Sequence, residues 1–334
     1  MDLSRIPIFK LPASVSIQVV RLFDKLSLAL LSVVSKKTML MVRSVGFKTK
    51  LSVSFSENRF ALFIYVGNDH YLSFLMRYDN TSNDIGSALP AHVLMISRLT
   101  DEVVKSQLEI DQSSSLFKAE TWIKNLKCAF HVEEINVYSN TTKFCMRSIC
   151  NIMRGVRINK LHATHNYQHF SQLIKMLHPL PNEIFPTAAN RVADSPADQA
   201  LTRKVLIQNF RFVALVEELS LDTLLMTNVS RLIFFAESLN NKEFNFFIKF
   251  WLKTKCTKLE HLYLCSREPL NENVVSEGIG YVKQPDSRVN VFDHTDAPLI
   301  GNRPAKGGYD IKRKDGTIAT ITLEGHLFRM IVWI

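Results

Sequence analysis

Residues 230–264 read SRLIFFAESLNNKEFNFFIKFWLKTKCTKLEHLYL. A compact apolar run over Ser230–Phe235 predicts a strand, and apolar residues at helical spacing predict a helix over Lys242–Lys253. A second apolar run over Leu259–Leu264 predicts another strand. This stretch therefore predicts a strand–helix–strand unit. The stripe on its helix, Phe244, Phe247, Ile248 and Trp251, could line a recognition pocket, but its helical spacing favours core packing.

Strand-like and helix-like segments also alternate upstream of this unit. Such alternation predicts stacked βα units, of which a leucine-rich-repeat-like arc is one arrangement. The expected helices lie over 116–130, 144–153 and 167–177, and the expected extended segments over 134–138, 156–161 and 205–213.

The two flanks of this region have a period of two. Upstream, 51–55, 60–66 and 70–78 predict a β-meander, followed over 79–114 by a polar loop with one short apolar element at 93–96. Downstream, 309–314 and 317–323 predict a hairpin around Asp315-Gly316, a pair that favours positive φ at both central turn positions. The apolar run 327–333 predicts a last strand tied into the core. The expected fold class is therefore α+β or α/β, with a β-hairpin-rich C-terminus.

Residues 11–45 predict several short helices that begin near Leu11-Pro12. About forty residues cannot hide so broad an apolar stripe by themselves. The stripe is therefore either a partner-binding surface or is covered by the rest of the chain.

Composition narrows the class of protein. The chain has 334 residues, 46% of them apolar, and a formal net charge of +10, which describes a globular protein. No apolar run is long enough to span a bilayer, so no membrane segment is expected. Pro7, Lys10 and Pro12 interrupt the start, which argues against a signal peptide. Five thinly spread cysteines favour reduced thiols, and we expect an intracellular protein, cytoplasmic or nuclear.

Three segments resemble a known family. LP at 11–12, Val20 and LALLSVVSKKTMLMVRSV from Leu28 resemble the short F-box of the large nematode F-box family. The segment 219–264 is similar to the type-2 F-box-associated domain, with its Asn-x-Phe…Trp-Leu helix and Lys-Leu-Glu-x-Leu strand. The tail YDIKRKDGTIATITLEGHLFRMIVW also resembles this family's usual ending.

The resemblance implies a substrate-recognition subunit of a Skp-cullin-F-box ubiquitin ligase. Residues 1–46 would be the F-box, and 47–334 the F-box-associated substrate-recognition domain, with its family-like core at about 205–275 and its β-rich tail at 309–334. The F-box would dock on a Skp-type adaptor bound to a cullin scaffold, and the second domain would bind an unknown protein substrate. Such a receptor is not an enzyme and has no catalytic residues. The residues expected to contact the adaptor are Leu11, Pro12, Val15, Val20, Leu28, Leu31 and Val34.

The main alternative is a stand-alone protein-interaction module whose N-terminal helices pack on its own core. A third reading depends on 135–182, which has no Asp or Glu but six Lys/Arg and four His. This stretch could be a solvated face, a site for an acidic peptide or a nucleic-acid site. The last is not expected, because the stretch has no recognisable nucleic-acid-binding module. His162, His165 and His169 would share a helix face only if a helix began before 162, so no metal site is expected. No catalytic motif or cofactor cradle is present.

Overall fold

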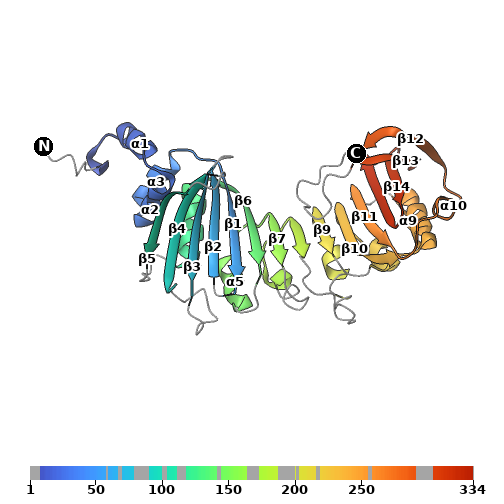
Figure 1. Cartoon of the computed structure of the whole chain (residues 1–334), viewed down its shortest axis with the longest axis horizontal. Helices are drawn as coiled ribbons and strands as arrows, with labels where there is room; N and C mark the ends of the chain where they lie inside the picture. Colours follow the sequence, from blue (N-terminus) through green and yellow to red (C-terminus); the bar gives the residue numbers. More distant parts are fainter. Residues whose placement is uncertain are drawn as a thin grey trace. The chain divides into compact units, whose positions relative to one another are not determined.

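The computed structural model describes residues 8–57, 59–66, 70–78, 90–99, 104–110, 118–140, 144–163, 173–186, 200, 203–215, 219–254, 258–290 and 304–333. The chain divides into two compact units, residues 1–165 with 169–181, and residues 182–334 with 166–168. Each unit combines helices with a β-sheet, so the predicted mixed class is confirmed (Figure 1). No helix among the described residues is long and apolar enough to cross a membrane.

The first unit opens with short helices, as the sequence predicts. A 3-10 turn (Ile8–Lys10) precedes α1 (Ala13–Arg21), α2 (Lys25–Val34) and α3 (Lys36–Arg43). The side chain of Asp24 accepts a hydrogen bond from the Ser27 backbone N–H and so caps α2. Ser35 and Thr38 form a capping box at the start of α3. These caps separate the apolar segment into two helices at Ser35.

A seven-stranded sheet follows, in the order β7-β6-β1-β2-β3-β4-β5. The predicted meander is confirmed as antiparallel, and β6 and β7 are added in parallel to β1. The helices α4 (Ala119–Ala129) and α5 (Met146–Ile152) belong to this unit. The strands are β1 (Thr49–Ser56), β2 (Arg59–Val66), β3 (His70–Arg77), β4 (His92–Leu99), β5 (Val104–Ile110), β6 (Val132–Ser139) and β7 (Lys160–Ala163).

Alternate residues of this sheet form its core. Leu51, Val53 and Phe55 of β1 are completely buried. On the same face, the ring of Phe74 lies 4.7 Å from that of Trp122 in α4. Lys50, Ser52 and Ser54 alternate with these residues and point to the other face, which we call the open face.

The prediction of a loop over 79–114 is wrong for part of that range. β4 extends well beyond the expected apolar element at 93–96, and β5 pairs with it in an antiparallel ladder. The remainder of the predicted loop, and residues 167–172 of the helix expected at 167–177, lie outside the described residues.

The second unit contains an eight-stranded sheet in the order β12-β13-β14-β15-β11-β10-β9-β8. Its quoted strand–helix–strand segment forms as predicted, with the neighbouring strands β10 and β11 parallel and α9 between them in sequence. The helices are α8 (Leu221–Leu225), α9 (Asn241–Lys253) and α10 (Glu272–Val275). The strands are β8 (Glu183–Pro186), β9 (Phe212–Leu215), β10 (Arg231–Leu239), β11 (His261–Ser266), β12 (Tyr281–Asn290), β13 (Ala305–Lys312), β14 (Ile318–Glu324) and β15 (Leu327–Trp333).

Two details of this unit differ from expectation. Residues 203–206 are helical, so the extended segment expected over 205–213 begins only with β9. The β13–β14 turn has positive φ at Gly316 but not at Asp315. The Gly316 N–H donates to the Arg313 carbonyl, and the Arg313 N–H donates to the Thr317 carbonyl. This pattern is a type I turn followed by a glycine bulge, in place of a two-residue turn with two positive φ angles.

The last strand is tied into the core as predicted, because β15 pairs with β11 on one side and β14 on the other. Phe328 of β15 stacks on Phe244 of α9 with ring centroids 4.4 Å apart. The parallel order β8-β9-β10-β11 is compatible with stacked βα units, and the leucine-rich-repeat-like arc itself stays a prediction.

Candidate docking surface on the N-terminal helices

The N-terminal helices have a buried side that holds them to the first unit. Val20, Leu28, Ala29 and Val42 are completely buried. Helices α2 and α3 contact α4, and α2 also contacts β4. These contacts make the three helices part of the compact first unit.

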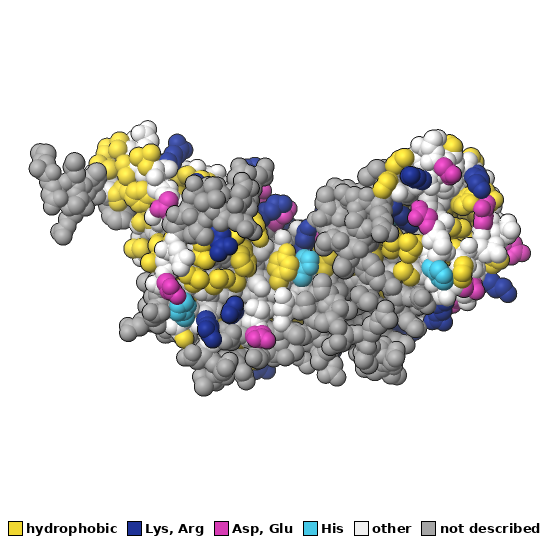
Figure 2. Space-filling model, in the orientation of Figure 1, with side chains coloured by type: hydrophobic (Ala, Val, Ile, Leu, Met, Phe, Trp, Pro, Cys, Tyr) yellow, Lys and Arg dark blue, Asp and Glu magenta, His cyan; other side chains and the backbone are white. Residues whose placement is uncertain are grey.

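The other side of the same helices exposes apolar side chains. The exposed fractions are 85% for Leu22, 67% for Val34, 47% for Leu40, 40% for Val15 and 38% for Phe23. Figure 2 shows hydrophobic side chains gathered over α1. A concentration of exposed apolar side chains on three consecutive short helices and the turn between the first two is typical of a partner-binding surface.

The seven predicted contact residues divide between these two sides. Pro12, Val15 and Val34 are exposed, and Leu11 and Leu31 are half-buried. Val20 and Leu28 have no exposed surface, so their assignment to a docking surface is corrected: they pack inside the unit. The prediction that the exposed residues contact an adaptor stays a prediction.

Sequence reasoning missed three exposed members, Leu22, Phe23 and Leu40. Leu22 follows Val15 by seven residues, or about two helical turns, so helical spacing could have found it. Phe23 follows Val19 and Val20 by four and three residues and belongs to the same helical pattern. Leu40 gives no clear signal, because its neighbours Met39 and Met41 are also apolar.

Asp24 and Lys25 set the geometry of the junction between α1 and α2. Partial burial acts to raise the pKa of Asp24, but hydrogen bonds from Ser27 outweigh it and hold that pKa below its usual value. The Lys25 ammonium lies 3.8 Å from the ring centroid of Phe47, and partial burial lowers the pKa of Lys25. The ionised Asp24 is therefore a stable cap for the helix that carries Leu31 and Val34.

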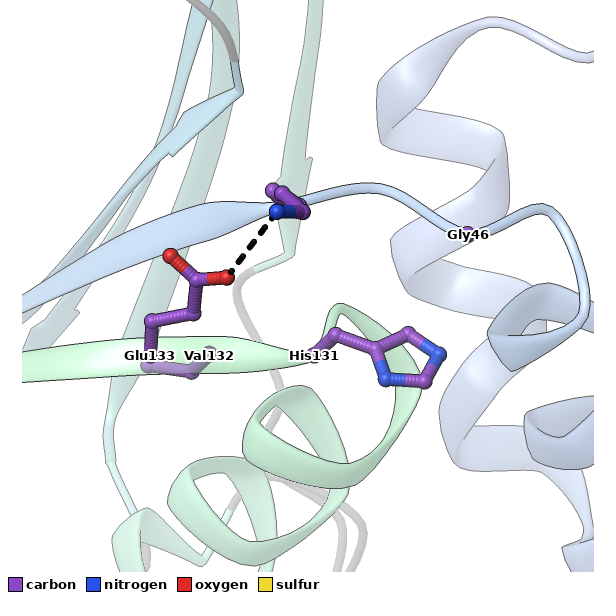
Figure 3. A pocket seen from close by; sticks show the side chains of 5 residues that line it. Gly46, His131, Val132 and Glu133 are labelled. Carbon is purple, nitrogen blue, oxygen red and sulfur yellow. Dashed lines mark ion pairs between the residues drawn. The ribbon is translucent and has the colours of Figure 1, made fainter.

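A shallow hollow of about 370 Å³ lies where α3 leads into β1, lined by Gly46, Lys48, His131, Val132 and Glu133. Figure 3 shows the Lys48–Glu133 ion pair across it, with an N···O distance of 3.7 Å. His131 Nε2 lies 3.0 Å from the Arg43 carbonyl oxygen at the end of α3. The hollow is lined by an exposed ion pair, and the contact between His131 and Arg43 joins the end of α3 to the residue before β6.

The other candidate sites have ordinary structural surroundings. Trp251 is completely buried, which assigns its stripe to the core. His162 lies on β7, and its ring stacks on Tyr138 with centroids 4.4 Å apart. His165 and His169 lie outside the described residues, among which no three His, Cys, Asp or Glu side chains are grouped to hold a metal. Arg147, Arg154 and Arg157 of the acid-free stretch are exposed.

Comparison with known proteins connects the second unit to one family. A family model described as F-box associated matches residues 201–264, which contain α8, β10 and α9. No curated protein and no solved structure gives a match to the chain. Residues 201–264 are therefore similar to F-box-associated domains, as the sequence resemblance indicated.

Proposed function

We propose that this chain is a substrate-recognition subunit of a Skp-cullin-F-box ubiquitin ligase. The observation that carries the proposal is the set of exposed apolar side chains on α1–α3 and in the turn between α1 and α2, which precedes a segment similar to F-box-associated domains. The N-terminal helices would bind a Skp-type adaptor, and the remainder of the chain would bind a protein substrate.

The exposed side chains are adequate for such an interface. Full burial of one large aliphatic side chain contributes about 1.5–3 kcal/mol. Leu22 and Val34 are mostly exposed, so each can contribute much of that value, and Val15, Phe23 and Leu40 contribute smaller shares. A few well-packed residues of this kind supply most of the affinity of a typical interface.

A receptor of this type needs no catalytic residues. It raises the effective concentration of substrate lysines near the ubiquitin-conjugating subunit, inside the cell, and contributes only binding energy. In this proposal the parallel strands of the second unit form a leucine-rich-repeat-like surface.

Co-purification with a Skp-type adaptor tests the proposal directly. The double variant Val15→Asp plus Val34→Asp places two charges on the exposed side of the helices, and it should abolish adaptor binding without changing the fold. Val282→Asp is a matched control, because Val282 on β12 is 64% exposed and Val34 is 67% exposed. Undiminished adaptor capture by the double variant would refute the docking assignment.

A stand-alone interaction module is the second candidate. The complete burial of Val20 and Leu28, and the packing of α2 and α3 on α4, favour it. A wild-type chain that captures no Skp-type adaptor, while its circular dichroism shows a folded protein, would select this candidate.

A further inference from the structure

The open face of the first sheet combines aromatic and basic side chains. Tyr65 of β2 lies opposite Tyr71 of β3, with ring centroids 6.1 Å apart. Tyr138 of β6 lies opposite His162 of β7, and their rings are nearly parallel at 4.4 Å. Between the two pairs, the Ser52 hydroxyl of β1 hydrogen-bonds both Tyr65 and Tyr138. An aromatic row therefore crosses five strands of the sheet.

Three guanidinium groups belong to the same face. Arg59 lies directly opposite Arg77, and Arg77 lies opposite His92, so basic side chains occupy neighbouring positions on three strands. Arg98 lies opposite Tyr71 at the end of the aromatic row. Like charges placed directly across a sheet are destabilising, so a bound anion would relieve this arrangement.

Among the described residues, no ion pair joins a carboxylate to these arginines. The acidic residues that the described strands place on this face are Glu134, which pairs with Lys50 at 3.1 Å, and Glu109, which pairs with His92 at 2.8 Å. Within the described ranges, Arg59, Arg77 and Arg98 have no acidic partner. The Nε of Arg98 is also buried without a hydrogen-bond acceptor, an arrangement that a ligand oxygen would complete.

Apolar side chains separate the basic positions. Leu75 lies between Arg77 and the aromatic row on β3, and Leu94 lies beside it on β4; both are half-buried. Figure 2, which shows this face, has hydrophobic side chains over β2–β4 with Lys or Arg side chains among them. On the described strands of this face, apolar side chains therefore separate the basic ones. A surface that binds a nucleic-acid backbone instead has a continuous basic groove.

We propose that the open face of the first sheet binds an acidic peptide segment in which carboxylate or phosphate groups alternate with apolar or aromatic side chains. Arg77 and Tyr71 lie six residues apart on β3, and Arg59 and Tyr65 lie six apart on β2, so about 20 Å separates the arginines from the tyrosines, the length of about six or seven extended residues. The acidic groups would bind Arg59, Arg77 and Arg98, and the apolar side chains would pack on the tyrosines. Only the identification of this peptide as a ubiquitylation substrate rests on the proposed function.

Peptide libraries test the site without any adaptor. One fluorescent dodecapeptide library has Glu at alternate positions and Leu, Phe, Tyr or Ser at the others; a second has phosphoserine and a third has Lys in place of Glu. We expect the full chain to bind the Glu library, the phosphoserine library or both in fluorescence anisotropy, and to bind the Lys library at least tenfold more weakly. The stronger acidic library identifies the source of the anionic groups. Affinity should fall as salt is raised.

Variants locate the site. Arg59→Ala plus Arg77→Ala should weaken acidic binding at least tenfold, whereas Arg147→Ala, an exposed arginine on α5, should leave it unchanged. Circular dichroism checks that the double variant remains folded. The proposal is overturned if neither acidic library binds, if the Lys library binds equally well, if the folded double variant binds normally, or if oligouridylate binds in preference to the peptides. None of these outcomes depends on whether the N-terminal helices bind an adaptor.

Discussion

Arg313 joins three parts of the second unit, and Arg313→Ala should destabilise that unit. Its guanidinium donates to the carbonyl oxygen of Thr254, at the end of α9, over 3.2 Å. It also donates to Thr317 Oγ1 over 3.1 Å and pairs with Asp315 Oδ2 at 2.7 Å in the β13–β14 turn. The guanidinium carbon lies 5.0 Å from the ring centroid of Trp251 in the core.

The size of the effect follows from these contacts. The Arg313 side chain is only 10% exposed, so water cannot replace the lost donors fully. Hydrogen bonds to charged groups contribute about 1.5–3 kcal/mol each, and a cation–π contact about 1 kcal/mol, but contacts of one side chain are not additive. We expect a loss of about 3 kcal/mol, since breaking a buried ion pair costs about 3–5 kcal/mol and Asp315 retains access to water.

Hydrogen exchange measured by mass spectrometry is the assay, because peptides from 241–254 report on the second unit alone. A loss of about 3 kcal/mol corresponds to exchange about 100-fold faster, at about 1.4 kcal/mol per factor of ten. Lys312→Ala is the matched control, since Lys312 is exposed at the end of β13, next to Arg313, and should change exchange less than threefold. Exchange in Arg313→Ala within threefold of wild type would refute this reasoning.

Three further predictions concern burial, protonation and backbone conformation. Val20→Ala should lower the free energy of unfolding of the first unit by about 2 kcal/mol in urea titrations, whereas Val34→Ala should change it by less than about 0.5 kcal/mol. Burial, with a smaller contribution from Lys160, lowers the pKa of His162 from 6.5 to about 4. At these pH values the folded state therefore binds fewer protons than the unfolded state. The first unit should lose about 1–2 kcal/mol of stability as pH falls from 6.5 to 4, after allowance for partial solvent exposure. His162→Gln should show a smaller loss over that range. Gly308→Ala should lower the free energy of unfolding by more than about 2 kcal/mol, because φ at Gly308 is +105° and the new Cβ would lie 2.6 Å from the Ile321 carbonyl oxygen. Gly316→Ala should lower it by only about 1–2 kcal/mol, because φ is +94° but no atom lies within 4 Å of the new Cβ. Thermal denaturation measures both.

The elements that sequence reasoning predicted best are those whose burial is one-sided. Phe244, Phe247, Ile248 and Trp251 all face the core from one side of α9, so the period of 3.6 is unmistakable. In β1 the completely buried residues alternate with polar ones, which gives the period of two. When only one side of a helix or strand is buried, apolar residues recur with the period of that element, and this recurrence predicts the element from the sequence.

Strands with little burial were not predicted. Exposed and partly exposed residues such as Tyr281, Val282 and Val289 fill β12, and its backbone pairing with β13 places no constraint on side-chain polarity. β5 alternates Val104, Leu108 and Ile110 with polar residues, but the polar sequence around it outweighs so short a pattern.

The sequence predicted that the N-terminal helices have exposed apolar residues, but not which residues these are, for a related reason. α2 is apolar on more than one side, and the sequence does not say which side meets α4. Leu28 packs inward and Val34 points outward, although both are equally plausible contact residues from their types. The composition of the open face was equally hidden, because Tyr65, Tyr138 and His162 come from distant segments that only the strand order brings together.

The packing of the N-terminal helices gives the two proposed surfaces a mechanical connection. Helix α2 contacts β4, and β4 carries Leu94 and Arg98 of the open face. An adaptor on the exposed side of α1–α3 and a peptide on the open face would thus bind one compact unit, without a flexible linker between them. A receptor that presents lysines to a conjugating enzyme gains effective concentration from such rigidity, because a flexible connection would spread the substrate over a larger volume. The completely buried residues Val20 and Leu28 therefore have a role in the proposed function: they hold the N-terminal helices within the unit that would bind the substrate.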